Sequence, residues 1–341
     1  MGEKHRILTG HRATGPRHIG HLVGTLRQYA ALQSEYDCYF LVADLHALTT
    51  AFDRPQDLSR NTLEVTADFL ACGIDPQKAS LILQSAIPEH AQLCLLLSML
   101  ANVSRLERNP TYKDQLHELK LQPSLGFLGY PVLQAADILL YQGQYVPVGE
   151  DQLPHLELAR EIARRFNQLY GPTFPEPQAI LSRMPRLPGI DNRTMHASYG
   201  NAIFLGDTPG ETNAKVMRMY TDPTRVHASD PGHVENNPLF TYLDAFDPDQ
   251  ERVAEFKQAY QTGTVGDVEI KHHLADVLNE TLAPLRERRT RLLANRSGLI
   301  EILRCGTERA RSLAEATYEM AACKMGLLTL NQSFYDKEKN T

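Results

Sequence analysis

The segment TGHRATGPRHIGH, residues 9–21, contains three histidines among several small residues. Small residues would let a nucleotide backbone approach, and a helix that begins near Gly20 would offer unpaired N–H groups to an anion. The segment has neither the G-x-G-x-x-G of dinucleotide sites nor the G-K-[ST] of a P-loop, which argues against both kinds of site. His18 and His21 could ligate a metal, but no third ligand accompanies them. We interpret both as hydrogen-bond donors, to a phosphate oxygen and to a nucleotide ring.

An aspartate interrupts the apolar helical segment GYPVLQAADILLY, residues 129–141. Burying a carboxylate without partners is costly, so Asp137 needs a hydrogen-bond donor. The partner could be a helix terminus or a nearby arginine, or it could be a substrate in an apolar pocket. The segment GEDQ, residues 149–152, follows a strand-like run and precedes a helix. Its side chains could cap that helix, or they could bind ribose hydroxyls and an ammonium group.

A third polar segment, DNRTMHASYGNAI, covers residues 191–203. It contains one strong base, Arg193, followed by a Thr-Met-His-Ala-Ser run. The run has the residue pattern of a phosphate-binding signature but none of its lysines. From these residues alone, a solvated linker and a mobile catalytic loop are both possible.

The elements that must position these residues alternate along the first half of the chain. Segments of helical period, such as residues 21–33 and 58–73, separate short apolar runs that are typical of strands. The predicted strands are Arg6–Gly10, Tyr39–Asp44, Ser80–Ser85 and Tyr145–Gly149. This alternation predicts an α/β fold with a Rossmann-like, doubly wound parallel sheet. Ligands of such folds bind outside the carboxyl ends of the strands.

The pattern changes at the Pro/Gly-rich joint MPRLPGIDNRT, residues 184–194, and beyond about residue 206 it is helical throughout. Residues 272–296 and 298–327 carry a strong 3.6-residue period. We predict a Rossmann-like catalytic domain at residues 1–190, a catalytic loop and linker at 191–205, a helical domain at 206–330 and a tail at 331–341.

The 35 basic and 41 acidic residues give a net charge of −6, so no global basic field draws nucleic acid to the protein. A local patch could still contact tRNA phosphates. Arg286, Arg289 and Arg296 form a basic helical stripe that is either solvated or such a patch. No apolar run reaches the roughly 20 residues that span a bilayer. The N-terminus lacks a signal-peptide core, and the five cysteines are scattered, which predicts a cytoplasmic protein with reduced thiols.

His18-Ile19-Gly20-His21, preceded by Thr14-Gly15, resembles the first signature of the class I aminoacyl-tRNA synthetases, with Ala13 where the family usually has proline. The blocks AADILLY, VPVGEDQ, VADLHALTT and CGIDPQKASLILQS resemble the bacterial tryptophanyl-tRNA synthetases in particular, and the similarity runs from about Ile7 to Leu327. The resemblance implies activation of L-tryptophan by ATP with Mg²⁺, and then transfer to tRNA(Trp). It also implies a homodimer, an anticodon-binding role for the helical domain, and no metal site held by the protein.

The resemblance also implies site residues. The tryptophan-binding residues would be Leu8, His46, Tyr130, Asp137, Val148 and Gln152, with Asp137 accepting the indole N–H. The ATP-binding residues would be Arg12, Ala13, Thr14, Gly20, His21, Gly149, Glu150, Asp151, Thr194, Met195, His196, Ala197 and Ser198. The catalytic residues would be His18, His21, Arg193, Thr194, His196 and Ser198.

In this resemblance, residues 194–198 occupy the positions of the second class I signature, K-M-S-K-S. The lysines of that signature are expected to stabilise the leaving pyrophosphate. Arg193 could reach the same phosphates, with His196 as an auxiliary donor. Three functions are therefore considered: a working tryptophanyl enzyme, a weakened paralogue that binds tryptophan and ATP as a sensor or partner, and a tyrosyl enzyme of the same fold.

Overall fold

Within the residues that the computed structural model describes (4–119, 123–182, 186–227 and 229–328), five parallel strands form one sheet. They are β1 (Arg6–Arg12), β2 (Asp37–Ala43), β3 (Ala79–Leu83), β4 (Tyr145–Val148) and β5 (Gln178–Leu181), in the spatial order β3-β2-β1-β4-β5. The predicted α/β class with a parallel sheet is confirmed, and all four predicted strands are present. The short edge strand β5 was not predicted, because it is half exposed and lies in a proline-rich segment.

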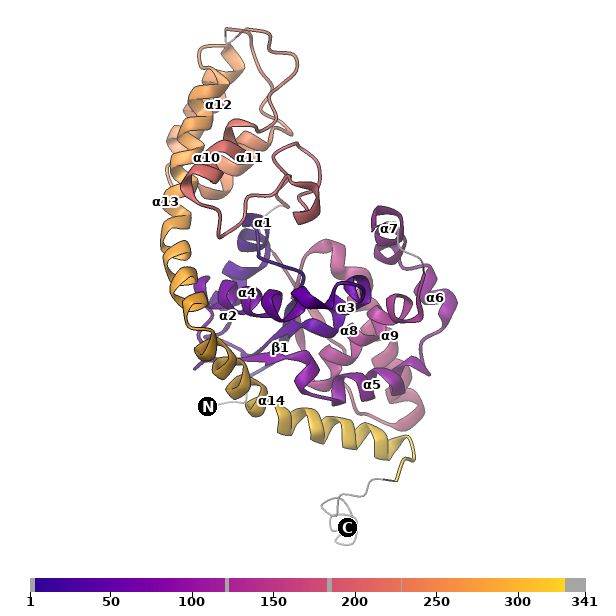
Figure 1. Ribbon diagram of the computed structural model, residues 1–341. Helices are drawn as coiled ribbons and strands as arrows, with labels where there is room; N and C mark the ends of the chain where they lie inside the picture. Colours follow the sequence, from indigo (N-terminus) through magenta and orange to yellow (C-terminus); the bar gives the residue numbers. More distant parts are fainter. Residues whose placement is uncertain (1–3, 120–122, 183–185, 228, 329–341) are drawn as a thin grey trace.

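Helices connect the strands and continue beyond them (Figure 1). In the first half they are α1 (Ile19–His21), η1 (Leu22–Leu26), α2 (Arg27–Leu32), α3 (Asp44–Ala51), η2 (Pro55–Asp57), α4 (Leu58–Ala71), η3 (Gln84–Ala86), α5 (Glu89–Ser98), α6 (Val103–Glu107), α7 (Pro110–Leu119), α8 (Leu125–Leu140), η4 (Glu150–Gln152) and α9 (Leu153–Tyr170). In the second half they are η5 (Ala197–Tyr199), α10 (Pro209–Met217), α11 (Pro238–Phe246), α12 (Gln250–Thr262), α13 (Asp267–Ala294) and α14 (Arg296–Lys324).

Alternate residues of each strand face opposite layers of helices, as the period of two requires. Ile7 and Phe40 belong to the same buried cluster as Tyr29 of α2 and Phe69 of α4. The next residues along β1 and β2, Leu8 and Leu41, belong to a second cluster with α5, α8 and α9. The central sheet is therefore covered on both faces, which is why β2 and β3 are largely apolar.

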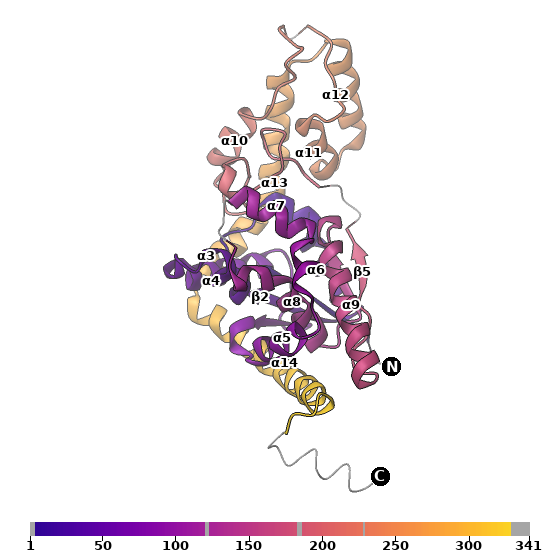
Figure 2. The same cartoon turned by 90° about the vertical axis from the view of Figure 1, so that its right-hand side faces the viewer.

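Helices α10 to α12 and the first half of α13 form a helical extension above the sheet, where Figures 1 and 2 place them. The long helix α13 continues from this extension down to α4, and α14 then passes beneath the sheet. Gly306 of α14 lies against the backbone of Leu81, and the Thr307 hydroxyl accepts a hydrogen bond from the N–H of Leu83 over 3.1 Å. The predicted domain boundaries stay predictions, and residues 329–341, including the predicted tail, lie outside the described residues.

The chain leaves β1 for β2 on one side and reaches β4 on the other, so the connections diverge between β1 and β4. At such a point the loops after neighbouring strands separate and leave a crevice at the carboxyl ends. The two segments that follow these strands, residues 13–18 and 149–152, are the ones that the sequence singled out.

Candidate active site

Asp137 of α8 is 3% exposed and accepts hydrogen bonds from three side chains. His46 Nε2 lies 2.8 Å from Oδ2, His90 Nδ1 lies 2.6 Å from Oδ1, and Gln84 Nε2 lies 2.9 and 3.0 Å from the two oxygens. The far nitrogen of His90 contacts the Tyr141 hydroxyl at 2.9 Å. Burial alone would raise the pKa of Asp137, but the hydrogen bonds and charges of the two histidines lower it to about 2. The carboxylate is therefore ionised at neutral pH.

These three partners occupy most of the roughly four lone-pair positions of the carboxylate. The His46 side chain is 9% exposed, whereas that of His90 is fully buried. A ligand N–H that approaches Asp137 therefore meets His46 first, and it must share an oxygen with that ring or displace it.

Tyr130, also on α8, is fixed by a short chain of hydrogen bonds. Its hydroxyl lies 3.1 Å from His155 Nε2, and His155 Nδ1 lies 3.0 Å from Asn109 Nδ2. Burial lowers the pKa of His155 to about 4, so the ring is neutral at pH 7. Because Asn109 Nδ2 can only donate, Nδ1 accepts and the ring proton lies on Nε2, which donates to the tyrosine oxygen. The Tyr130 oxygen therefore keeps one lone pair that can accept a hydrogen bond from a ligand N–H, and its O–H can donate to another acceptor.

The turn that follows β4 lies at the same edge of the sheet. Gln152 donates to Asp151 Oδ2 over 2.8 Å, so its amide points along the turn. A Cβ atom on Gly149 would lie 2.7 Å from Asp151 Oδ1, so a side chain there would require the exposed Asp151 carboxylate to move. Leu8 and Val148 are buried in the layer that contains α8, and Glu150 is exposed.

The loop after β1 begins with Arg12, whose guanidinium donates to the Thr50 hydroxyl. The Ala13 N–H bonds to Ala43 O over 3.2 Å, which ties the loop to the end of β2. Thr14 is exposed, so its hydroxyl is open to solvent. The loop therefore lies at the carboxyl edge of the sheet, with the Arg12 side chain held by Thr50 and the Thr14 side chain open to solvent.

His18, Gly20 and His21 lie at the start of the first helix, with the two histidine rings 3.8 Å apart. Burial, and next the charge of Arg17, lower the pKa of His18 to about 3 and that of His21 well below its ordinary value. Both rings are therefore neutral at pH 7. A Cβ atom on Gly20 would lie 2.9 Å from His18 Nδ1 and 3.1 Å from Met195 Sδ, so only glycine fits between them.

The second signature segment is organised by a buried amide, Asn201. Its Nδ2 donates to Thr194 O over 3.0 Å and to Asp191 Oδ1 over 2.8 Å, while its Oδ1 accepts from the His196 N–H at 2.9 Å. Met195, between them, is buried against the first loop. Ala197 lies in η5 and is exposed. The segment is thus a folded loop, although the side chain of Ser198 lies outside the described residues.

The Arg193 side chain forms an ion pair with an aspartate of its own loop. Its Nη2 and Nε lie 2.6 and 2.8 Å from Asp191 Oδ2, and its side chain is 74% exposed. An aspartate that already neutralises this guanidinium weakens any replacement of the missing lysines by Arg193.

The structure brings the two signature segments together. Ile19 N–H donates to Ile203 O over 2.9 Å, and His18 forms an isolated antiparallel bridge with Phe204. The charge of His196 contributes to lowering the pKa of both His18 and His21, so the substituted loop lies within electrostatic reach of the first signature.

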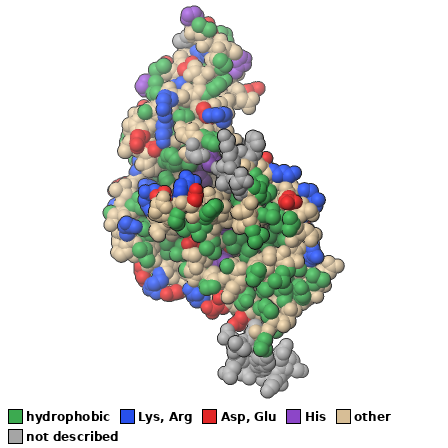
Figure 3. Space-filling model, turned by 45° about the vertical axis from the view of Figure 1, so that its right-hand side comes forward, with side chains coloured by type: hydrophobic (Ala, Val, Ile, Leu, Met, Phe, Trp, Pro, Cys, Tyr) green, Lys and Arg blue, Asp and Glu red, His purple; other side chains and the backbone are tan. Residues whose placement is uncertain are grey.

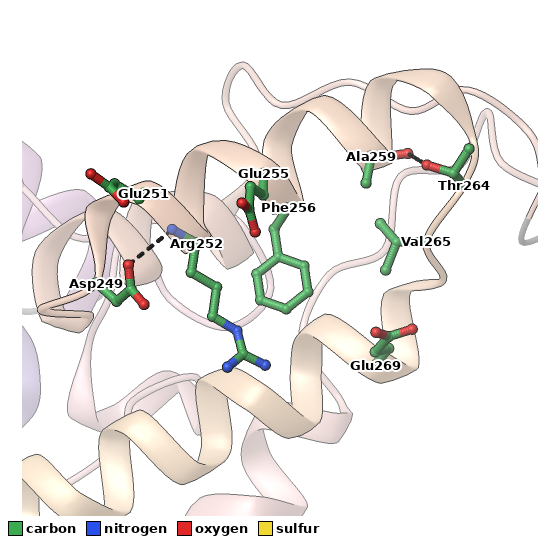
Figure 4. A pocket seen from close by; sticks show the side chains of 9 residues that line it. All are labelled: Asp249, Glu251, Arg252, Glu255, Phe256, Ala259, Thr264, Val265 and Glu269. Carbon is green, nitrogen blue, oxygen red and sulfur yellow. Dashed lines mark hydrogen bonds between the residues drawn. The ribbon is translucent and has the colours of Figure 1, made fainter.

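A separate cavity of about 520 Å³ opens on the helical extension, between α12 and the start of α13 (Figure 4). Four carboxylates and one arginine line it, together with Phe256 and Val265: Asp249, Glu251, Arg252, Glu255 and Glu269. A lining with an excess of negative charge repels phosphates, so this cavity suits neither ATP nor a tRNA backbone.

The basic stripe of α13 has structural partners. Arg286 donates to Asn279 and Thr212, and Arg289 pairs with Asp68 and Glu64. Arg289 is therefore neither a solvated side chain nor directed at tRNA, whereas for the half-buried Arg286 and the exposed Arg296 the two interpretations stay predictions.

Sequence reasoning missed the residues that fix the others in place. Gln84 lies at the end of the predicted strand at residues 80–85, so its position at the carboxyl edge was a usable signal. His90, Asn109 and His155 come from helices and loops with no recognisable motif, and only the fold brings them to Asp137 or Tyr130. In the described part of the chain, no group of three His, Cys, Asp or Glu could hold a metal, and no helix is long and apolar enough to cross a membrane.

Comparison with known proteins gives a consistent result. The family model of the class I tRNA synthetases (W and Y) matches residues 1–283. The tryptophan–tRNA ligase of Chlamydia caviae is 49% identical, over 94% of this chain and 95% of its own length. That of Thermotoga maritima is 48% identical, over 95% and 99%. The crystal structure of tryptophanyl-tRNA synthetase from Campylobacter jejuni, complexed with ADP and tryptophan, is 34% identical with a TM-score of 0.84 and covers 94% of this chain and 100% of that one.

The edge of the sheet therefore holds both class I signature segments in contact, on a chain whose relatives align over nearly its full length. The chain belongs to the class I tRNA synthetases of the tryptophan and tyrosine group.

Proposed function

We propose that this protein is a tryptophan–tRNA ligase, which condenses L-tryptophan with ATP to tryptophanyl-adenylate and pyrophosphate and then transfers the tryptophanyl group to tRNA(Trp). The observation that carries the proposal is the contact between the two signature segments, through the bond from Ile19 N–H to Ile203 O. The buried, ionised carboxylate of Asp137 supports the proposal as well.

In the proposed complex, Asp137 accepts the indole N–H, while Tyr130 and Gln152 hold the α-ammonium group. His46 borders the pocket, and Leu8 and Val148 form apolar walls. A substrate analogue that lacks the N–H leaves a buried carboxylate without its ligand partner, which penalises it strongly. A phenol could also donate to Asp137, but the curated relatives at 48–49% identity are tryptophan–tRNA ligases, which favours tryptophan.

For ATP, we propose that residues 12–14 and His18 bind the phosphates, that residues 149–151 face the ribose, and that Gly20 and His21 face the adenine. The tryptophan carboxylate oxygen attacks the α-phosphorus in line, and pyrophosphate leaves. The neutral rings of His18 and His21 donate hydrogen bonds rather than positive charge. Because the described donor set holds no metal group, Mg²⁺ would enter bound to the phosphates of ATP.

The second signature loop, residues 193–198, would cover the leaving pyrophosphate. Its positive charge is low, since lysine is absent and Arg193 pairs with Asp191. This observation supports a second candidate function: a paralogue that binds tryptophan and ATP but forms adenylate slowly and acts as a sensor or partner.

Tryptophan-dependent pyrophosphate exchange, followed by charging of tRNA(Trp), separates the two candidates. A ligase exchanges and charges; exchange without charging indicates the paralogue. Binding is readily measured because the chain contains no tryptophan residue, so the fluorescence of the substrate itself can be excited selectively. A protein that neither binds tryptophan nor exchanges pyrophosphate would refute the proposed ligase.

We also propose a homodimer that works in the cytoplasm, where ATP and tRNA are present. Leu95, Met99 and Val103 are exposed on and between α5 and α6. Figure 3 shows hydrophobic side chains gathered over the face that these helices share. A contiguous apolar patch of this kind favours association. Sedimentation of the wild type and of Met99→Glu tests it: a monomeric wild type contradicts the dimer.

A further inference from the structure

A buried carboxylate outside the candidate active site joins three parts of the chain. Asp68 of α4 is 0% exposed. Its Oδ2 accepts the backbone N–H of Arg17 over 2.7 Å, and its Oδ1 accepts Nε of Arg289, from α13, over 2.6 Å. Glu64, one turn earlier on α4, pairs with the same guanidinium. One carboxylate thus holds the first signature loop through one oxygen and α13 through the other.

On the loop side, Arg17 closes the phosphate-binding segment on itself. Its Nη2 donates to the carbonyl oxygens of Arg12 and Gly15, the former over 3.2 Å. Its own carbonyl accepts the N–H of Leu205 over 2.9 Å. The Arg17 guanidinium therefore holds the loop backbone at two carbonyl groups. The hydrogen bond between the Arg17 N–H and Asp68 fixes the backbone of Arg17 itself.

On the helix side, α13 connects Arg289 directly to the helical extension. Ile270 and Leu274, near its first end, are buried in the core that includes α11. The same continuous helix carries Arg289 to α4, as Figures 1 and 2 show for its path. Arg289 also lies against Gly206, where a Cβ atom would lie 2.8 Å from Nη1. Pro284 lies between Leu274 and Arg289, but α13 runs through it without a break, so a movement of the extension along α13 acts on Arg289.

We propose that Asp68 is a positioning residue of the adenylation reaction, coupling the position of the helical extension, through Arg289, to the conformation of the ATP-phosphate loop. The inference rests on the proposed ligase function. Burial raises the pKa of Asp68 to about 7, so withdrawal of Arg289 would leave a buried carboxyl group that loses a hydrogen-bond donor and takes up a proton, which is unfavourable. The loop and α13 therefore change position together. A tRNA bound to the extension would alter the affinity for ATP, and ATP would alter the affinity for tRNA by the same factor.

Two variants separate the halves of this connection. Asp68→Asn keeps an oxygen for the Arg17 N–H but removes the charge that Arg289 pairs with. Arg289→Met removes the guanidinium and leaves the loop bond. The double variant removes the charges of Asp68 and Arg289 together, so only Glu64, whose side chain is 21% exposed, loses its partner. Arg304→Met is the matched control, because Arg304 pairs with Glu301 and Glu308 on the exposed surface of α14.

We expect each variant at Asp68 or Arg289 to weaken ATP binding and to raise its KM in pyrophosphate exchange by about fivefold or more, a typical size for coupled sites. Tryptophan affinity, read from the fluorescence of the substrate, should stay within about twofold. Because the two residues act through one contact, the double variant should lose no more than the worse single variant. Arg304→Met should match the wild type.

An unchanged KM for ATP in variants that melt like Arg304→Met would overturn the inference. So would an equal loss of ATP and tryptophan affinity, which indicates general damage, or additive losses in the double variant. If the wild type neither binds ATP nor exchanges pyrophosphate, the proposed function fails and this inference with it. A wild type that does both, beside unaffected variants, refutes the positioning role alone.

Discussion

Replacing Thr194 by lysine restores one of the charges that the second signature loop lacks, and the structure defines what that charge can do. The Thr194 side chain is exposed, while its carbonyl is held by Asn201 Nδ2 over 3.0 Å. Met195, the next residue, is buried against the first loop. A lysine at residue 194 would therefore extend into open space from a fixed backbone, beside the proposed position of pyrophosphate.

The size of the effect follows from Coulomb's law. Opposite unit charges about 4 Å apart interact by about 1 kcal/mol in water and by about 4 kcal/mol at an effective dielectric constant of roughly 20. Since about 1.36 kcal/mol corresponds to a tenfold rate change, Thr194→Lys should accelerate adenylate formation between about fivefold and about 10³-fold. The exposure of the position favours the lower part of that range, and we expect about tenfold.

The assay is single-turnover formation of tryptophanyl-adenylate, with Thr194→Met as a control of similar length without charge. Added salt should reduce the acceleration by lysine, because an exposed charge is screened. Tryptophan affinity should not change, since the loop lies outside the indole pocket. If lysine and methionine have the same effect, or if lysine has none, the missing charge is not what limits this loop, and the reasoning is wrong.

Three further outcomes follow from the site. Asp137→Asn should weaken tryptophan binding by about 10- to 100-fold, because a charge-assisted hydrogen bond becomes a neutral one; unaltered fluorescence titrations would remove Asp137 from the pocket. Gly20→Ala should slow adenylation while Gly24→Ala does not, since a Cβ atom at Gly20 would lie 2.9 Å from His18 and the one at Gly24 meets nothing within 4 Å; equal rates contradict the close packing. Folded-state pKa values of about 3 for His18 and about 4 for His155 lie below the unfolded value of 6.5, so stability is complete above pH 6.5 and falls as the unfolded chain takes up protons. The loss at pH 5.5 should be about 1.4 kcal/mol per histidine, and denaturant unfolding of His155→Gln should show a shallower fall.

The fold and the outline of the site were predictable because their signals are local. An apolar run bounded by turn residues identifies β1 or β4, and a carboxylate inside an apolar helix identifies Asp137 as a residue that needs a partner. The identity of the partners was not predictable in this way. His90 reaches Asp137 from another helix, and Asn109 reaches Tyr130 only through His155. Those contacts depend on helix packing, which short sequence patterns do not encode.

The interpretation of Arg289 as part of a basic surface was wrong for the same reason. A helical wheel of α13 shows which side chains share a face, but it does not show what that face meets. Arg289 meets Asp68 and Glu64 of α4, more than 200 positions earlier in the chain. At Arg289, one residue of the basic face therefore forms an internal connection.

The contact between α14 and β3 has a consequence for the order in which the protein can be completed. Thr307 and Gly306 come near the end of the chain, yet they cover the edge of a sheet whose strands begin at Arg6. Until that last helix has been synthesised, β3 has an open edge that invites pairing with other chains. The half of the chain that forms the sheet is thus not an independent module. A chain that ends before α14 should aggregate rather than survive as a smaller enzyme.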